Sequence, residues 1–441
     1  MYIRLQYFLI FSFLLNKSFI FSFIPHPLKL LNISLPKNTT HKKTTSFLSK
    51  ITQKNSIIIN SEKMSDTQKK TSISILENGL FAIEVKIGSN EQTFNLILDT
   101  GSFYFWIPEN TTENINIRKY HLFNPKFSST AYKTNDTFIL FYGHSYAFCN
   151  YYFDQIQILP KKNVTMRFGV ANNTNFNISG ADGIIGLARK YNKGIDSSIL
   201  KLKKNNMINS NIFSIKYYDE NQTADLFLGE EHEDFYSKQN IGSCPLQSNL
   251  DYHKYFWMCK LKSFSLNYND FNYSFNLNKD VLFNTGINWI ILPKNLSDSL
   301  IPFLEKFNCF SYDESKINSK ILCRNFSQIP NITLEIGQYY FFMNNSYMYK
   351  EFVSSCGTTF YELKIYFEEN IEFATIGMPF FYQFHTMFDM NSNHLKFYSK
   401  QMDIKKTFNT LDNSDKFNYN SINILLTYTV IILVAIFGIL L

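Results

Sequence analysis

Two stretches of this sequence share a pattern whose chemistry would centre on a carboxylate. The first spans residues 96–108 (LILDTGSFYFWIP) and the second spans residues 281–293 (VLFNTGINWIILP). Each has three apolar residues, Asp or Asn, Thr-Gly and a mostly apolar run, with Pro nine positions after the Asp or Asn. In the first stretch, the carboxylate of Asp99 could take a proton from a bound water, as a general base does.

The second stretch carries Asn284 where the first carries Asp99. A carboxamide donates and accepts hydrogen bonds, but it neither releases nor takes up a proton at any working pH. We therefore expect the second loop to keep its shape while it lacks an acid. A single carboxylate without an ionisable partner should also titrate nearer its ordinary pKa than a coupled pair does.

Each stretch is followed by a second matching segment. The glycine of Ile-Ile-Gly at 184–186 lies 87 positions after Asp99, and that of Thr-Ile-Gly at 375–377 lies 93 positions after Asn284. Chance is a poor explanation of four matched elements, so we interpret them as an internal duplication. The pattern predicts two β lobes that each supply one loop to a shared site.

The elements that must position these loops are predicted to be strands. Short apolar or alternating runs recur through the body of the chain, and helical periodicity is weak, best at 196–203 and 298–306. We find no P-loop, dinucleotide-binding glycine pattern, zinc-binding cysteine pair or serine-hydrolase elbow, and we predict no cofactor and no metal site. The predicted strands cover residues 80–87, 93–98, 155–159, 211–217, 225–228, 256–266, 333–336 and 386–398.

These residues resemble the pepsin-like aspartic proteases, and most closely the plasmepsins of malaria parasites. The resemblance covers about residues 72–400 and implies a mainly β, bilobal fold with two duplicated β lobes and a central cleft. The matching segments are Asp-Thr-Gly-Ser at 99–102, Phe-Asn-Pro at 123–125, Tyr-Gly at 142–143, Asp-Gly-Ile-Ile-Gly-Leu at 182–187, Ile-Gly-Met-Pro-Phe at 376–380 and Met-Phe-Asp at 387–389.

The resemblance assigns roles to individual residues. In the family two carboxylates share one proton and activate a water, here at Asp99 and at the position of Asn284. Trp106 is expected in the core beside the first loop. The resemblance also implies that Thr100, Gly101, Ser102, Thr285 and Gly286 support the site and that Tyr142, Gly143 and His144 form a flap that binds substrate.

The sequence departs from the family in both lobes. Ile287 stands where the family has a Thr or Ser that hydrogen-bonds the second carboxylate, and the flap reads His144-Ser145-Tyr146 in place of Thr-Gly-Ser. Two functions stay open. One is an aspartic-type endopeptidase that hydrolyses polypeptides through water activated at Asp99. The other is an inactive pseudoprotease that binds peptides while tethered to a membrane. A purely structural surface protein with a collapsed cleft is a third alternative.

Six cysteines fit an oxidising compartment. The resemblance implies a disulfide between Cys323 and Cys356. Cys244 and Cys259 lie on strands that we expect to pair, and a bond between them is one option. Cys149 and Cys309 have no obvious partner, so we expect two buried free thiols or one bond between them.

The two ends of the chain indicate the secretory pathway and a membrane. An apolar run after Arg4 is typical of a signal peptide or an uncleaved signal anchor, and the last 20 residues are uncharged. They suit either a transmembrane anchor or a glycolipid-anchor signal, with the body on the lumenal or extracellular side. The predicted order is signal segment 1–24, basic propeptide or linker 25–71, lobes 72–240 and 241–400, polar stalk 401–421 and anchor segment 422–441.

The charge distribution argues against a nucleic-acid partner. The net charge is +7, but residues 1–64 hold nine Lys or Arg and a single acidic residue, Glu62. That segment alone carries +8, which leaves −1 for the rest of the chain. A near-neutral body lacks the basic face that phosphates require, so we expect a polypeptide as the substrate or ligand.

Overall fold

The computed structural model describes residues 70–407, except for 111–120, 143–144, 177–179, 190–196, 238, 251–252, 269–270, 314–318 and 355–356. The predicted signal segment, most of the stalk and the predicted anchor segment therefore lie outside the described residues. So do the flap residues Gly143 and His144, the propeptide up to residue 69, and Cys356. Within the part that is described, no helix has both the length and the apolar character needed to span a bilayer.

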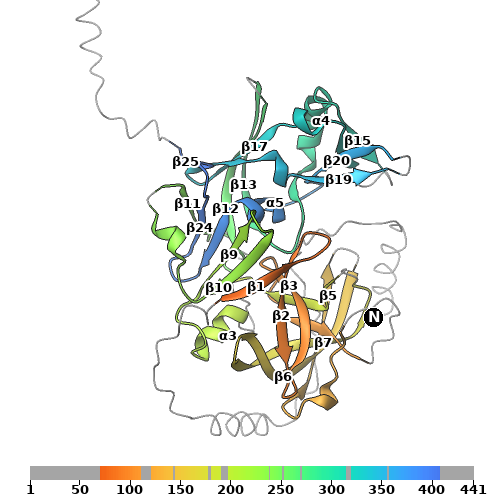
Figure 1. Ribbon diagram of the computed structural model, residues 1–441, viewed down its shortest axis with the longest axis vertical. Helices are drawn as coiled ribbons and strands as arrows, with labels where there is room; N and C mark the ends of the chain where they lie inside the picture. Colours follow the sequence, from red (N-terminus) through yellow and green to blue (C-terminus); the bar gives the residue numbers. More distant parts are fainter. Residues whose placement is uncertain are drawn as a thin grey trace, which may run out of the picture.

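The described chain is mainly β and has two lobes, as predicted. In Figure 1 the orange and yellow strands form one lobe, the green and blue strands form the other, and β1, β9 and β10 lie between them. The first sheet has the order β11-β24-β23-β9-β10-β1-β2-β3-β8-β4-β7-β6-β5. Its strands are β1 Lys70–Ile75, β2 Phe81–Ile87, β3 Gln92–Asp99, β4 Trp106–Pro108, β5 Tyr132–Tyr142, β6 Ser145–Leu159, β7 Lys162–Thr174, β8 Gly183–Gly186, β9 Ile212–Tyr218, β10 Thr223–Leu228, β11 Ile241–Pro245, β23 His385–Asp389 and β24 His394–Tyr398.

This first sheet closes on itself and also crosses between the lobes. A further pairing of β2 with β6 closes its N-terminal part into a barrel. At the opposite end, β23 pairs antiparallel with β9, and β24 and β11 follow β23. Strands from the second half of the chain therefore complete a sheet that begins in the first half.

The second lobe is built on two further sheets. The larger sheet has the order β21-β14-β22-β13-β12-β17-β18-β25, and the smaller has the order β15-β16-β20-β19. Their strands are β12 Met258–Tyr268, β13 Phe271–Phe283, β14 Ile290–Pro293, β15 Cys309–Asp313, β16 Ser319–Cys323, β17 Asn331–Ile336, β18 Tyr339–Met343, β19 Tyr349–Val353, β20 Thr359–Leu363, β21 Ile365–Glu368, β22 Ala374–Ile376 and β25 Ile404–Lys406.

The helices are short and join the sheets. Helix α3 begins where the Ser197 side chain accepts a hydrogen bond from the Leu200 amide, which satisfies one of the free N–H groups of its first turn. The α-helices are α3 Ser198–Lys204, α4 Ser297–Glu305 and α5 Met378–Gln383, and the 3₁₀ turns are η3 Pro125–Phe127, η4 Glu233–Tyr236, η5 Lys294–Leu296, η6 Phe326–Gln328 and η7 Asn345–Tyr347.

The duplication inferred from the sequence is present in the strand pairing. In the first lobe β3 runs parallel to β8, and β4 pairs antiparallel with β8 and parallel with β7. In the second lobe β13 runs parallel to β22, and β14 pairs antiparallel with β22 and parallel with β21. The two predicted Gly-containing partner segments are β8 and the end of β22, so each loop is held by an equivalent set of strands.

Two disulfide bonds are present in the described residues. Cys244 on β11 bonds Cys259 on β12, the option suggested by the sequence. The pairing implied for Cys323 with Cys356 is corrected, because Cys323 bonds Cys309. The register of β15 and β16 places these two cysteines directly opposite each other, so Cys309 is not a free thiol. Cys149 is free and buried, and burial raises the pKa of its thiol.

The second lobe packs around an aromatic cluster on α5. The ring of Phe380 is fully buried and lies 4.5 Å from that of Phe384, centroid to centroid. It also contacts the rings of Phe283, Phe341 and Phe397 at 5.4, 5.5 and 5.4 Å. Because Phe283 is the residue before Asn284, this cluster fixes the base of the second loop.

We expect Phe380→Ala to lower the free energy of unfolding by about 3–5 kcal/mol, because it leaves a cavity in a close-packed cluster. Chemical denaturation of the purified chain measures this change. Phe127→Ala is the matched control, since Phe127 is 63% exposed and its removal should cost less than about 0.5 kcal/mol. Equal losses in the two variants would contradict the role given to this cluster.

Candidate active site

The two loops of the duplicated pattern meet at the junction of the lobes. Asp99 ends β3 and Asn284 follows β13, and both side chains are fully buried. Asp99 lies opposite Gly186 in the parallel pairing of β3 with β8, and the Asn284 amide donates to the Ile376 carbonyl at 2.9 Å. Equivalent strands therefore present the carboxylate and the carboxamide.

Two threonines join the loops through reciprocal hydrogen bonds. The Thr100 amide donates to Thr285 Oγ1 at 3.1 Å, and the Thr285 amide donates to Thr100 Oγ1 at 3.0 Å. Thr100 Oγ1 donates to the Phe283 carbonyl at 2.8 Å, and Thr285 Oγ1 donates to the Leu98 carbonyl at 2.6 Å. Since all four bonds are buried and cross between the lobes, they set the relative position of Asp99 and Asn284.

The glycine of each loop leaves room for the side chain of the other. A Cβ atom on Gly286 would lie 2.6 Å from Asp99 Oδ1 and 3.1 Å from Asn284 Oδ1. A Cβ atom on Gly101 would lie 2.3 Å from Asn284 Nδ2. These distances are too short for real contacts, so both positions require glycine. They also show that the carboxylate and the carboxamide border the same small space.

Asp99 is held by donors from its own loop. The Gly101 amide donates to Asp99 Oδ1 at 2.9 Å, and Ser102 Oγ donates to Asp99 Oδ2 at 2.5 Å. Burial raises the pKa of Asp99 to about 6, and these hydrogen bonds only partly oppose that increase. The pKa of this lone carboxylate therefore lies above its ordinary value, and its comparison with a coupled pair stays a prediction. Removal of water from the carboxylate shifts its pKa even without a second acid.

Asn284 has one satisfied atom and one unsatisfied atom. The Gly286 amide donates to Asn284 Oδ1 at 2.7 Å, the counterpart of the bond from Gly101 to Asp99. Asn284 Nδ2 is buried and finds no hydrogen-bond acceptor among the residues that the structure describes. Ile287 occupies the position equivalent to Ser102, is 2% exposed, and has no polar group to offer. A buried donor of this kind needs an acceptor from a bound molecule or water.

The predicted flap is a hairpin of β5 and β6. Tyr142 pairs with Ser145 across its tip, and the Tyr142 ring is buried against Trp106 and Phe176. Trp106 Nε1 donates to the Tyr142 hydroxyl at 3.0 Å. Burial, followed by the charge on Asp99, raises the pKa of Tyr142 well above its ordinary value.

Trp106 therefore has a role beyond the core packing expected from the sequence. It lies on β4, directly after the first loop, and its indole links that loop to the flap through Tyr142. The sequence signal for this role is the position of Trp106 shortly after Asp-Thr-Gly in the repeated stretch. A separate hollow of about 690 Å³ is lined by residues of β12, β13, β17 and β18, and neither Asp99 nor Asn284 lines it.

Comparison with known proteins places this site within one protein family. The family model for eukaryotic aspartyl proteases matches residues 80–400, which include both loops and the flap. Gastricsin of Mus musculus is 21% identical over 322 residues, covering 71% of this chain and 79% of the relative. Pepsin F of Oryctolagus cuniculus is 24% identical over 319 residues (70% and 79%), and vacuolar protease A of Aspergillus fumigatus is 24% identical over 327 residues (72% and 78%).

The raised pKa of Asp99 makes a prediction about stability. The folded state holds the proton up to about pH 6, while an unfolded Asp loses it near pH 3.8, so stability falls as the pH rises through this window. Asp99→Asn should therefore increase the free energy of unfolding at pH 7 by up to about 3 kcal/mol, since one pKa unit corresponds to about 1.4 kcal/mol.

Chemical denaturation at pH 7 and pH 4 tests this prediction, with a gain expected at pH 7 only. Asp136→Asn is the control, because the Asp136 side chain is 66% exposed and its ion pair with Arg167 is worth less than about 1 kcal/mol. A loss of stability at pH 7 in Asp99→Asn would show that the ionised carboxylate is a structural requirement.

Proposed function

The chain belongs to the eukaryotic aspartyl protease family, and from this premise we propose that it is an aspartic-type endopeptidase of strongly reduced activity. It binds an extended polypeptide between its lobes and hydrolyses peptide bonds through a water activated at Asp99. The observation that carries this proposal is the pair formed by a buried carboxylate and the unsatisfied Nδ2 of Asn284, which border one space.

The base half of the reaction is retained. Above about pH 6 Asp99 is ionised, and it accepts a proton as the water oxygen attacks the carbonyl carbon. Asp99 then returns this proton to the leaving nitrogen as the C–N bond breaks. The bonds from Gly101 and Ser102 keep the carboxylate oriented during both transfers.

The acid half is replaced by a weaker interaction. Asn284 Nδ2 donates a hydrogen bond to the carbonyl oxygen of the substrate, which gives the buried donor the acceptor that it lacks. It cannot pass a proton to that oxygen, so the tetrahedral intermediate stays anionic. Positioned proton transfer contributes about 10²–10⁴-fold to a rate, and we expect a deficit of that size.

Substrate entry requires the flap to move. Asp99 is fully buried and Tyr142 is 4% exposed, so the hairpin of β5 and β6 must open before a peptide reaches the carboxylate. On closing, the hairpin would exclude water, and the Trp106–Tyr142 hydrogen bond would return the tyrosine to its place.

A catalytically inactive, peptide-binding role is the second candidate. Asn284 together with Ile287 favours it, because the acid and its expected hydrogen-bond partner are both replaced. The same polar groups would then hold a peptide without cleaving it. A purely structural role is less well supported, because the buried charge of Asp99 costs stability and only a reaction or a ligand makes use of it.

The cellular setting is part of this proposal. The two disulfide bonds suit a secreted or lumenal protein. We infer three further features from the sequence: a propeptide, membrane attachment through residues 422–441, and a particular resemblance to plasmepsins. Together they indicate a membrane-tethered zymogen.

We expect Asn284→Asp to increase kcat/KM by about 10²–10⁴-fold and to move the optimum toward acid pH, because it restores a carboxylate pair that shares a proton. Peptide-library cleavage by the full chain between pH 4 and pH 8 measures both changes. The wild-type rate should be small and should rise through about pH 6, as Asp99 ionises.

Two further variants complete the design. Asp99→Ala should abolish cleavage by the wild type and by Asn284→Asp. Ile287→Thr should raise the rate only when combined with Asn284→Asp, because the introduced hydroxyl has a second carboxylate to orient only in that background. Wild-type cleavage that survives Asp99→Ala would refute the mechanism. Peptide binding without any wild-type cleavage would establish the second candidate.

A further inference from the structure

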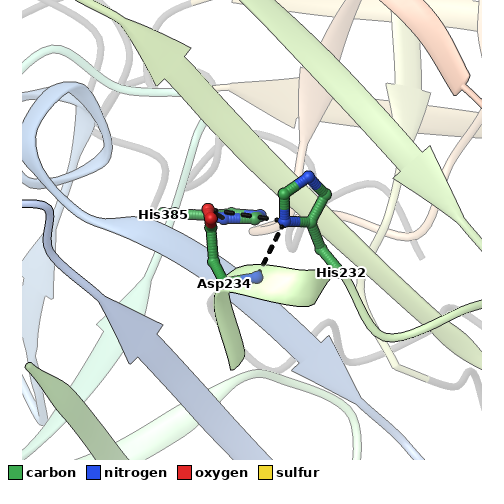
Figure 2. A group of neighbouring side chains, drawn as sticks. All are labelled: His232, Asp234 and His385. Carbon is green, nitrogen blue, oxygen red and sulfur yellow. Dashed lines mark hydrogen bonds and ion pairs between the residues drawn. The ribbon is translucent and has the colours of Figure 1, made fainter. Parts of the chain in front are cut away.

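Two histidines and one carboxylate meet away from the active site, beside the sheet that crosses between the lobes. His232 caps η4, Asp234 is the second residue of η4, and His385 begins β23, 151 positions after Asp234. Figure 2 shows the Asp234 carboxylate and the two imidazoles close together. The rings of His232 and His385 lie 4.9 Å apart, centroid to centroid. One ligand atom from each residue lies within 4.8 Å of the others. The family resemblance gives this group no role.

Two short contacts in the cluster centre on one oxygen. His385 Nδ1 lies 2.7 Å and Lys216 Nζ lies 2.8 Å from Asp234 Oδ2. His232 Nδ1 lies 3.4 Å from this oxygen and accepts a hydrogen bond from the Asp234 backbone amide at 3.2 Å. The Lys216 ammonium therefore forms a close ion pair with the Asp234 carboxylate.

The other nitrogen of His385 also has a partner. His385 Nε2 lies 2.9 Å from Ser214 Oγ on β9. Serine, histidine and aspartate in this order match the nucleophile, base and orienting acid of a serine hydrolase. Ser214 is fully buried in the middle of the sheet, however, so no substrate can reach its hydroxyl. The arrangement cannot act as a hydrolase, and the serine serves instead to orient the imidazole.

An oriented neutral imidazole is what a metal ion requires. Metal-bound histidines almost always donate their other ring N–H to an oxygen, and Ser214 Oγ stands in that position. Both ring nitrogens of His385 face an oxygen, Asp234 Oδ2 at 2.7 Å and Ser214 Oγ at 2.9 Å, which orients the imidazole. Rings of Phe227 and Phe235 pack on His232 and His385 at 4.5 and 4.6 Å and fix both imidazoles.

The cluster is also open to solvent on one side. The side chains of His232 and Asp234 are 14% and 13% exposed, whereas that of His385 is 3% exposed. Lys216 is 23% exposed, and its ammonium group forms an ion pair with the carboxylate. A divalent ion could enter on this side and take the place of the lysine ammonium.

We propose that His232, Asp234 and His385 form a site for a divalent transition-metal ion of the Zn²⁺ type, which binds in exchange for Lys216. Two imidazoles and one carboxylate, with water in the remaining position, are a ligand set that Zn²⁺ accepts. On binding, His385 moves its proton from Nδ1 to Nε2, so that Nδ1 faces the metal and Nε2–H donates to Ser214. His232 Nδ1 exchanges its hydrogen bond from the Asp234 amide, 3.2 Å long before the ion binds, for the metal. The ion would link η4 to β23 and so stabilise the crossing sheet.

Titration of the full chain with Zn²⁺ alone tests this proposal, with calorimetry for affinity and thermal unfolding for stabilisation. Zn²⁺ should bind with one-to-one stoichiometry at this site and raise the melting temperature. His232→Asn should remove this binding, because Asn can still accept the Asp234 amide that caps η4 but is a poor zinc ligand. His121→Asn is the matched control, since His121 contacts Asp182 with its side chain 77% exposed and no second imidazole is described beside it.

Two other variants separate a metal site from an ion-pair network. Lys216→Met should tighten Zn²⁺ binding, because the competing ammonium is gone, whereas a purely structural network would only lose stability. Ser214→Ala should weaken binding by about 10–100-fold, as loss of an outer hydrogen-bond partner does. Absence of Zn²⁺-dependent stabilisation in both the wild type and Lys216→Met would overturn the proposal. So would binding that His232→Asn leaves unchanged.

Discussion

The reciprocal hydrogen bonds between Thr100 and Thr285 are the constraint on which the rest of this structure depends. They are buried, they cross between the lobes, and they join two loops that lie 185 positions apart in sequence. Each threonine also donates to a carbonyl of the opposite lobe, so neither loop can shift without leaving buried polar groups unpaired. The glycines that follow are needed because this junction brings the Asp99 and Asn284 side chains so close.

Replacement of one acid by an amide changes the electrostatics of the site without changing its architecture. Two carboxylates that bordered the same small space would repel each other unless they shared a proton. With Asn284 that repulsion is absent. Burial is then what raises the pKa of Asp99, while its hydrogen bonds lower it. The loop hydrogen bond from Gly286 persists because Asn284 Oδ1 accepts it as a carboxylate oxygen would. Shape is preserved while proton transfer is lost.

Local patterns predicted the fold well and the contacts between distant residues less well. The repeated Asp/Asn-Thr-Gly stretches predicted two equivalent lobes, because the same strand pairings must hold both loops. The bond between Cys309 and Cys323 escaped prediction because it depends on the register of β15 with β16. The pKa of Asp99 depends on burial that no single segment reveals. His385 meets His232 and Asp234 only through the crossing sheet, so the sequence holds no local signal of that cluster.

The crossing sheet also sets the order in which this chain can fold. Strand β9 belongs to the first half, yet one of its two neighbours is β23, which begins at His385. During synthesis the N-terminal barrel can close early, since all of its strands, β2 to β8, are present by residue 186. The edge of β9 must wait until the last part of the second lobe has been made. Until then it is an unpaired strand edge, which makes the nascent chain dependent on protection from aggregation in the compartment where it folds.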